Sequence, residues 1–266
     1  MRLPSIPVVQ AGWRWISLAM TGLLLFMVYF ALTSPMFRVD AADIYGLKRL
    51  SDMKVYTMLD ISGEPIFTLD TANLEEALST QFPEFSSVNV EIGMPNTVAI
   101  SVTERVPVLA WIQNGTSQLV DSEGMAFPLR SDGPKYTTPV VEASSPPPVP
   151  RTFSIESIEQ ELEGVEAPSE EDVQAENAPF ITQEMVSAVL TLAKFAPEDT
   201  PLLYDGLHGL GWKDPRGWDV YFGTADEISV KLQVYGAVVG RLLADGIQPA
   251  LISVEYAHAP FYRMER

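Results

Sequence analysis

Residues 88–102, which read VNVEIGMPNTVAISV, decide the expected fold of the first half of the chain. Apolar and polar residues alternate over residues 88–92 and again over residues 98–102, with a Gly-Met-Pro-Asn sequence between the two runs. Alternation places every second side chain on the same face of a strand. Two such runs around a cluster of turn residues predict a β-hairpin.

One strand and two helices are expected ahead of this hairpin. The strand is predicted at residues 37–44. A first helix begins after Ser51, a residue type that caps helices, and its apolar residues recur at helical spacing: Met53, Tyr56 and Leu59. A second helix is expected to be capped by Asp70 or Thr71 and to end before Pro83, which cannot continue it. The order β-α-α-β-β predicts a small α+β unit whose helices cover one face of a sheet.

A membrane-spanning helix is expected before this unit, at residues 15–36. Residues 15–37 carry no charged side chain, and about 20 apolar residues are enough to cross a bilayer. Trp13 and Trp15 at one end and Tyr29 and Phe30 near the other match the aromatic belts of membrane spans. A cleaved signal peptide has a shorter apolar core and a small-residue cleavage site, which residues 31–35 match poorly, so an uncleaved anchor is favoured.

The basic residues around the span do not fix its orientation. Two arginines precede it and three basic residues follow soon after it, namely Arg2 and Arg14, then Arg38, Lys48 and Arg49. The positive-inside rule needs a clear excess on one side. The tail of residues 1–14 is too short to form a domain, so all folded mass is expected after the span.

Composition excludes several classes of function. The chain has 266 residues, 17 basic and 35 acidic side chains, and a formal net charge of −18, which argues against nucleic acid as a partner. It has no cysteine, so disulfides, thiolate metal sites and a cysteine nucleophile are excluded. The two histidines, His208 and His258, are too few for a multi-histidine metal site. We expect neither a metal nor a cofactor.

The second half, residues 108–266, is expected to be mostly β with flanking helices. Asn114-Gly115 is a two-residue hairpin signal. Residues 141–178 contain ten acidic side chains and one basic one, together with a proline cluster. This composition is typical of a flexible surface insertion, with an acidic docking segment or a spacer as alternatives.

Structure is expected to resume near Phe180. Thr182 caps a helix whose apolar side chains include Met185, Val189 and Leu192. Strands follow at residues 218–222 and 228–232, where Ile228, Val230 and Leu232 alternate with other residues. A helix at residues 234–244 ends at Gly246. A last strand covers residues 250–256 and, in its longest form, reaches residue 262.

No catalytic residues are predicted. The chain lacks a P-loop, a HExxH sequence and a G-x-S-x-G sequence. His208, within GLHGLG at residues 206–211, could in principle serve a Ser-His-Asp group, but no serine lies in a nucleophile-like turn. A loop role is favoured for His208 and His258. Glu104-Arg105 is interpreted as a solvated ion pair at a strand end, worth about 0–1 kcal/mol.

The order of several segments resembles the FtsQ/DivIB family of bacterial cell-division proteins. Residues 37–51 are similar to the start of a POTRA domain that follows a membrane anchor. The segments that match the narrower family are PIFTLD at 65–70, FP at 82–83, VNV at 88–90, MPNTV at 94–98, ERVP at 104–107, VLAW at 108–111 and LVDSEGMAF at 119–127. The resemblance implies a POTRA domain at residues 37–107, a β domain at 108–266 and a cytoplasmic N-terminus.

The C-terminal strand is the expected partner site. An exposed strand edge can be extended by a strand of a partner. In the FtsQ/DivIB family this region receives a small single-span coiled-coil protein, FtsB/DivIC. The resemblance therefore implies partner binding by Ile252, Ser253, Val254, Glu255, Tyr256, Ala257, Phe261 and Tyr262. The alternative is that Val254 and Tyr256 face the core.

Two departures from the family pattern affect this site. The family often has Leu-Gly after the penultimate strand, where this chain has Leu232-Gln233. Its last strand usually reads Asp-hydrophobic-Arg-Tyr, where this chain has Ser253-Val254-Glu255-Tyr256. The charge reversal at Glu255 weakens the case for a partner contact that depends on arginine, whereas backbone pairing does not depend on it.

The expected function is therefore a membrane scaffold without enzymatic activity. It would recruit other division membrane proteins, from the cell membrane or inner membrane, at the division septum. Two alternatives from other classes are an anchored extracytoplasmic hydrolase that uses His208 and a POTRA-type transport or assembly protein. The latter needs a many-stranded barrel, for which too few residues remain.

Overall fold

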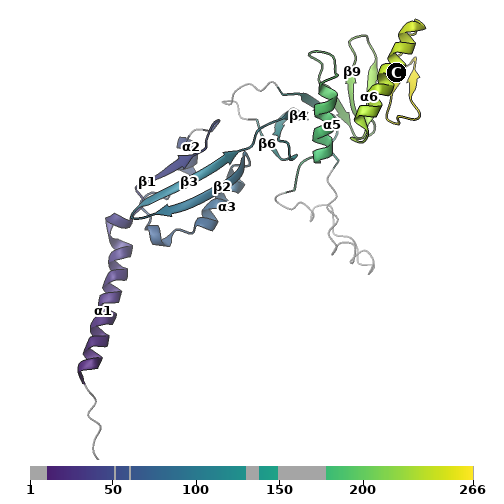
Figure 1. Ribbon diagram of the computed structural model, residues 1–266. Helices are drawn as coiled ribbons and strands as arrows, with labels where there is room; N and C mark the ends of the chain where they lie inside the picture. The colour runs from purple at the N-terminus through teal and green to yellow at the C-terminus, as the bar shows by residue number, and fades with distance from the viewer. Residues whose placement is uncertain (1–10, 51, 60, 130–137, 149–177, 266) are drawn as a thin grey trace, which may run out of the picture. The chain divides into compact units, whose positions relative to one another are not determined.

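The computed structural model describes residues 11–50, 52–59, 61–129, 138–148 and 178–265 (Figure 1). The chain divides into two compact units, Met1–Glu104 and Arg105–Arg266. Each unit has its own hydrophobic core. Together they form a mixed α+β protein, as expected from the sequence.

The first unit begins with α1, Ala11–Thr33, which is followed by the 3-10 turn η1, Pro35–Phe37. Within α1, the 21 residues Trp13–Thr33 are long and apolar enough to cross a membrane. At 1.5 Å per residue they extend about 30 Å, which matches the hydrocarbon core of a bilayer. The large apolar side chains of this helix are exposed, as the side chains of a membrane anchor would be before lipid covers them.

The rest of the first unit has the predicted order β-α-α-β-β. It contains β1 Ala41–Tyr45, α2 Asp52–Leu59, the 3-10 turn η2 Ile66–Thr68, α3 Thr71–Gln81, β2 Phe85–Gly93 and β3 Thr97–Glu104. The sheet order is β1-β3-β2, with β1 parallel and β2 antiparallel to β3 (Figure 1). The predicted hairpin is therefore β2–β3, and the crossover through α2 and α3 returns the chain to the far side of β3.

The buried face of α2 differs from the prediction. Met53 is 70% exposed, whereas Val55 is buried and packs in the first core with Leu78 and Phe82. A helix of two turns has too few apolar positions to define its own inner face, so contact with the sheet decides which side is buried. The second helix was predicted correctly: the Asp70 carboxylate accepts from the backbone N–H groups of Ala72 and Asn73.

Glu104 and Arg105 do not form the solvated ion pair that the sequence suggested. Glu104 is buried, and its carboxylate accepts from the backbone N–H groups of Lys48, Arg49 and Leu50 and from Arg49 Nε. Arg105 turns to the second unit, where its Nη1 lies 2.6 Å from Asp121 Oδ2. The partners of Glu104 are more than fifty residues away in sequence and Asp121 is sixteen residues from Arg105, so neither contact could be inferred from the dipeptide itself.

The second unit is built on a nine-stranded sheet. Its strands are β4 Leu109–Gln113, β5 Thr116–Val120, β6 Ala126–Pro128, β7 Val140–Ala143, β8 Leu202–Asp205, β9 Gly209–Lys213, β10 Asp219–Gly223, β11 Leu251–Ser253 and β12 Phe261–Arg263. Their order is β12-β11-β10-β9-β8-β7-β4-β5-β6. Helices α5, Gln183–Ala193, and α6, Ile228–Ala244, pack on this sheet (Figure 1).

The start of the predicted insertion, at residues 141–143, belongs to the sheet instead. Residues 140–143 form β7, an interior strand that lies parallel to β4 and to β8. Val141 is fully buried there. Burial of the apolar pair at residues 140–141 therefore places these residues in a strand, despite the proline cluster that follows them. Most of the predicted insertion, including the helix considered at residues 154–162, lies outside the described residues.

Other local predictions for the second unit are confirmed. Asn114 and Gly115 both have positive φ and join β4 to β5 as a two-residue turn. Thr182 Oγ1 accepts from the Met185 N–H at the start of α5, and Met185, Val189 and Leu192 are buried.

The strand predicted at residues 228–232 is wrong. These residues form the first turn of α6, with Ile228 and Lys231 buried and Val230 exposed. The short alternating sequence fits both periods, and the longer apolar run that follows extends the helix backwards through it.

Candidate partner-binding edge

The C-terminal strand of the prediction is two strands rather than one. β11 and β12 pair antiparallel, with Ile252 opposite Tyr262 and Ser253 opposite Phe261. The chain between them leaves the sheet after Val254, whose N–H still donates to the Tyr221 carbonyl oxygen. The edge of the sheet is therefore β12, and β11 lies inside it.

This division separates the eight predicted partner-binding residues into two groups. Ile252, Ser253 and Val254 are buried, and β11 is paired on both sides, to β10 and to β12. The side chains of Ile252 and Val254 belong to the core of the second unit, and the Ser253 hydroxyl donates to Glu255. These three residues therefore support the edge and do not present a surface. For Val254, the alternative considered from the sequence is the observed arrangement.

The other group is accessible to a partner. Phe261 and Tyr262 of β12 are 42% and 44% exposed, Tyr256 is exposed in the loop before β12, and Ala257 is half-buried. Met264, which the sequence reasoning missed, is exposed directly after β12. In the part of the chain that the structure describes, no strand pairs with the outer side of β12. Aromatic side chains beside unpaired backbone groups are suited to strand addition by a partner.

Glu255 faces away from this edge, into a cluster with His208. His208 Nδ1 lies 3.1 Å from Glu255 Oε1, and the Ser253 hydroxyl donates to the same oxygen at 3.0 Å. The His208 ring stacks on Tyr221 with ring centres 4.4 Å apart. Burial, with Asp219, Asp205 and Glu255 nearby, raises the pKa of Tyr221. Glu255 therefore attaches the loop after β11 to the turn between β8 and β9.

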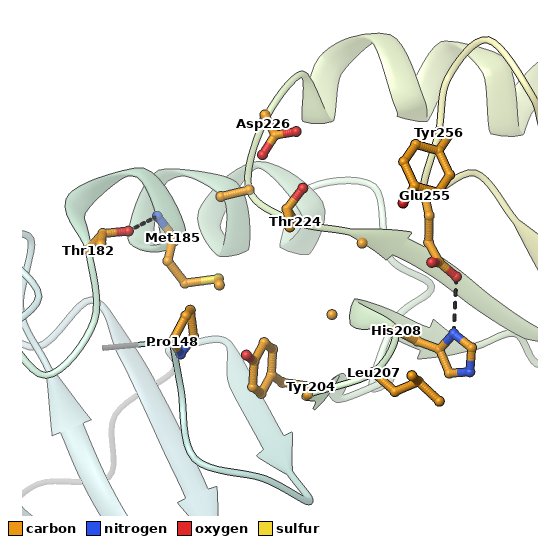
Figure 2. A pocket seen from close by; sticks show the side chains of 14 residues that line it. Pro148, Thr182, Met185, Tyr204, Leu207, His208, Thr224, Asp226, Glu255 and Tyr256 are labelled. Atoms are coloured by element: carbon orange, nitrogen blue, oxygen red, sulfur yellow. Dashed lines mark hydrogen bonds and ion pairs between the residues drawn. The ribbon is translucent and has the colours of Figure 1, made fainter. Parts of the chain in front are cut away.

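A cavity of about 430 Å³ opens beside this cluster. Figure 2 shows His208 and Glu255 meeting at one side of it, with Tyr204, Met185 and Thr224 around the rest. The cavity lies where β8, β10 and β11, which run in the same direction, reach their carboxyl ends. Its wall combines apolar side chains with a few polar groups, as small-molecule and side-chain pockets do.

The arrangement of His208 resembles part of a catalytic triad, in which a carboxylate orients an imidazole. The serine closest to this pair, Ser253, donates to Glu255 rather than to His208. Among the described residues, no hydroxyl is hydrogen-bonded to the His208 ring, and no three His, Asp or Glu side chains converge as metal ligands would. The observed contacts of His208 join two loops.

The comparison with known protein families concerns the first unit. A model of the POTRA domain, FtsQ-type, matches residues 37–105. This range contains the β-α-α-β-β elements of the first unit and ends at its boundary with the second.

Curated relatives extend the similarity beyond the POTRA domain. The cell division protein FtsQ of Chloroflexus aurantiacus is 23% identical over 99% of this chain and 91% of its own length. The protein of the same name from Streptomyces venezuelae is 31% identical over 52% of both chains. That from Myxococcus fulvus is 34% identical over 41% of this chain and 38% of its own length. The chain thus spans about half or less of the length of the latter two relatives.

These similarities agree with the order of elements in the structure. An apolar N-terminal helix precedes an FtsQ-type POTRA domain, and a mostly β unit follows it. The relatives that match are division proteins by name, which indicates a role in division for this chain. The first unit is therefore an FtsQ-type POTRA domain, and the chain as a whole is similar to the cell division protein FtsQ of several bacteria.

Proposed function

We propose that this protein is a single-span membrane scaffold of the division complex that recruits other membrane proteins through the β12 edge. The observation that carries the proposal is the exposed edge strand with Phe261 and Tyr262 on it and Tyr256 and Met264 beside it. An incoming strand would gain backbone hydrogen bonds from β12 and side-chain contacts from these residues.

The proposed partner is an FtsB/DivIC-like single-span coiled-coil protein, together with other division membrane proteins. In this proposal α1 crosses the cell membrane or inner membrane, with residues 1–14 in the cytoplasm and both folded units outside, and the protein is enriched at the septum. The anchor would keep β12 within reach of membrane-bound partners, which raises their effective concentration. The proposed role is recruitment, without catalysis.

Photo-crosslinking in native membranes tests the site. A photoreactive residue at Phe261 or Tyr262 is expected to capture a small single-span coiled-coil protein, identified by mass spectrometry. The matched control is Leu129, an exposed apolar residue that follows β6 at the opposite edge of the same sheet. Equal capture from Leu129, or no capture from β12 in a folded and inserted protein, would contradict the edge assignment.

A double substitution tests how much affinity the edge side chains supply. Phe261→Ala with Tyr262→Ala is expected to weaken binding of the purified partner by about 2 kcal/mol or more, since exposed aromatic residues are enriched among binding hot spots. Calorimetry with both proteins in detergent measures the change. Unchanged affinity would mean that the partner binds elsewhere.

A variant of His208 tests the hydrolase alternative. His208→Ala removes the contact with Glu255, so we expect some loss of stability in the second unit but normal complementation of a division defect. Loss of function with the fold and partner binding intact would favour catalysis by His208.

A further inference from the structure

A continuous series of aromatic contacts runs from α1 into the POTRA domain. The rings of Phe26 and Phe30 lie 6.4 Å apart, those of Phe30 and Phe37 lie 6.3 Å apart, and those of Phe37 and Phe67 lie 5.2 Å apart. Phe67 belongs to η2 and is far from Phe37 in sequence. The turn that carries Phe67 is therefore held next to the end of the apolar helix.

Backbone hydrogen bonds fix this turn independently of the rings. The Val39 N–H donates to the Glu64 carbonyl at 2.9 Å, and the Gly63 N–H donates to the Val39 carbonyl at 2.8 Å. Arg38 Nη1 donates to the Gly63 carbonyl at 3.1 Å. Ile66, in the same turn, is buried in the domain. Residues 63–67 thus cannot move far from residues 38–39 without unfolding part of the unit.

Chain length sets the depth at which this turn can lie. Phe37 is four residues beyond Thr33, the end of the apolar stretch, so it is at most about 14 Å away and closer when part of the connection is a 3-10 turn. The headgroup layer occupies about 5–8 Å on each side of the hydrocarbon core. With α1 in a bilayer, Phe37 is in or beside that layer, and Phe67 lies against Phe37.

The side chains at this end of the unit are apolar and accessible. Met36 is 59% exposed and Phe67 is 46% exposed. Met94, in the turn between β2 and β3, is also exposed. This turn lies at the same end of the sheet as the start of β1, because Thr97, the first residue of β3, pairs with Ala41, the first residue of β1. Aromatic side chains are favoured at the depth of the headgroups. The nearby charges are mixed, with Arg38 beside the exposed Asp40 and Glu64.

We propose that Met36, Phe37 and Phe67 form a membrane-contact patch that inserts into the headgroup layer and holds the POTRA domain against the bilayer. The proposal rests on the membrane anchoring of α1 proposed above. Because the nearby charges are mixed, apolar contact supplies the attraction, and a zwitterionic bilayer is sufficient. The patch adds a second attachment beside the single span, so the POTRA domain is held at the membrane surface.

The absence of cysteine from the chain allows a direct test by site-specific labelling. The full chain is reconstituted in phosphatidylcholine vesicles with one fluorophore-labelled cysteine, at Thr68→Cys beside the patch or at Met53→Cys. Met53 is exposed in the same unit but lies near the opposite end of the sheet, just after Leu50, which binds Glu104 at the end of β3. Lipids brominated near the headgroup are expected to quench the label at residue 68 and to leave that at residue 53 unquenched.

A second substitution separates insertion from simple proximity. Phe67→Ser is expected to reduce quenching at residue 68 to the level of residue 53, while the matched substitution Met53→Ser leaves quenching at residue 68 unchanged. Circular dichroism checks that both variants are folded. Equal quenching at residues 68 and 53, or quenching at residue 68 that persists in the Phe67→Ser variant, would overturn the proposal.

A label within α1 distinguishes this outcome from failure of the anchor itself. Leu24→Cys, at the middle of the span, is expected to be quenched by lipids brominated deep in the acyl chains. Quenching at residue 24 without quenching at residue 68 would overturn the membrane-contact patch and leave the anchor intact. Absence of quenching at residue 24 would overturn both.

Discussion

Glu104 shows how a single side chain can organise the POTRA domain. Burial by itself raises the pKa of this carboxyl, but the N–H groups of Lys48, Arg49 and Leu50, with the Arg49 side chain, outweigh it and lower the pKa below its ordinary value of 4.5. The charged form therefore closes the loop between β1 and α2 onto the end of β3. Hydrogen bonds to a buried charge are worth about 1.5–3 kcal/mol each at most.

We predict that Glu104→Gln destabilises the first unit by about 2 kcal/mol, because an amide NH₂ replaces an acceptor that faces several donors. The contribution of Glu104 is complete above pH 4.5 and is lost as the pH falls through its lowered folded-state pKa. The stability of the Glu104→Gln variant should lack this acid-dependent contribution.

Hydrogen exchange at the amides of residues 48–50 measures the loss of stability. Glu76→Gln, an exposed change on α3, is the control, and equal exchange in both variants would contradict the prediction.

Tyr235 occupies a comparable position in the second unit. Its hydroxyl donates to Asp214 Oδ2 at 2.8 Å and accepts from Trp218 Nε1 at 3.3 Å, while Arg216 binds both oxygens of the same carboxylate. Burial is the main cause that raises the pKa of Tyr235 to about 12. This group could not be predicted from the sequence, because Asp214, Arg216 and Trp218 come from the turn before β10 whereas Tyr235 comes from α6.

We predict that Tyr235→Phe costs about 1–2 kcal/mol, since two buried polar groups lose a partner. A raised folded-state pKa means that the contribution of Tyr235 is complete below pH 10 and is lost between pH 10 and about 12. Denaturant unfolding across this pH range measures the loss of stability, and tyrosinate absorbance measures the titration of Tyr235. The control is Tyr262→Phe, which removes an exposed hydroxyl on β12, outside this hydrogen-bonded group. A Tyr235→Phe profile identical to that of the parent chain would refute the assignment.

At the scale of elements, α6 differs most from the sequence prediction. A strand at residues 228–232 would bury Val230 with Ile228, whereas the helix exposes Val230 and buries Lys231, whose Nζ donates to the Thr224 carbonyl at 3.1 Å. Burial lowers the pKa of Lys231. One buried lysine among apolar residues concealed the helical period in this short stretch.

A helix and a strand at residues 228–232 would tolerate substitutions at different positions. We expect Val230→Lys to change the free energy of unfolding by less than about 0.5 kcal/mol, as exposed changes usually do. Ile228→Ala should cost about 2–4 kcal/mol through loss of buried volume. Thermal unfolding of both variants measures the difference. A large loss from Val230→Lys would favour the strand.

At the scale of the whole molecule, the two units have separate cores, so changes at the partner edge should remain within the second unit. We predict that a chain ending at Ala259, which lacks β12, loses partner capture but keeps normal hydrogen exchange in β1, β2 and β3. The truncation exposes β11 as a new edge, so some increase in aggregation is expected. Retained capture by the shortened chain would show that β12 is not the partner site.

The sequence predicted the elements whose signals are local. The apolar run of α1, the hairpin at residues 88–102, the Asp70 and Thr182 caps and the Asn114-Gly115 turn each depend on a few consecutive residues. It also predicted the order β-α-α-β-β. The candidate site was predicted only in part, because Phe261 and Tyr262 could be recognised as aromatic but the strand break after Val254 could not.

The sequence by itself therefore determined the apolar helix, the order β-α-α-β-β of the first unit and the absence of thiol chemistry, because period, capping and composition act within a few residues. The tertiary structure decided which residues are accessible. Pairing with β10 buries Ile252 and Val254, the hairpin makes β12 the edge, and contacts with distant backbone bury Glu104 and bring Phe67 to Phe37. Such contacts join residues that are far apart in sequence, so only the folded chain specifies them.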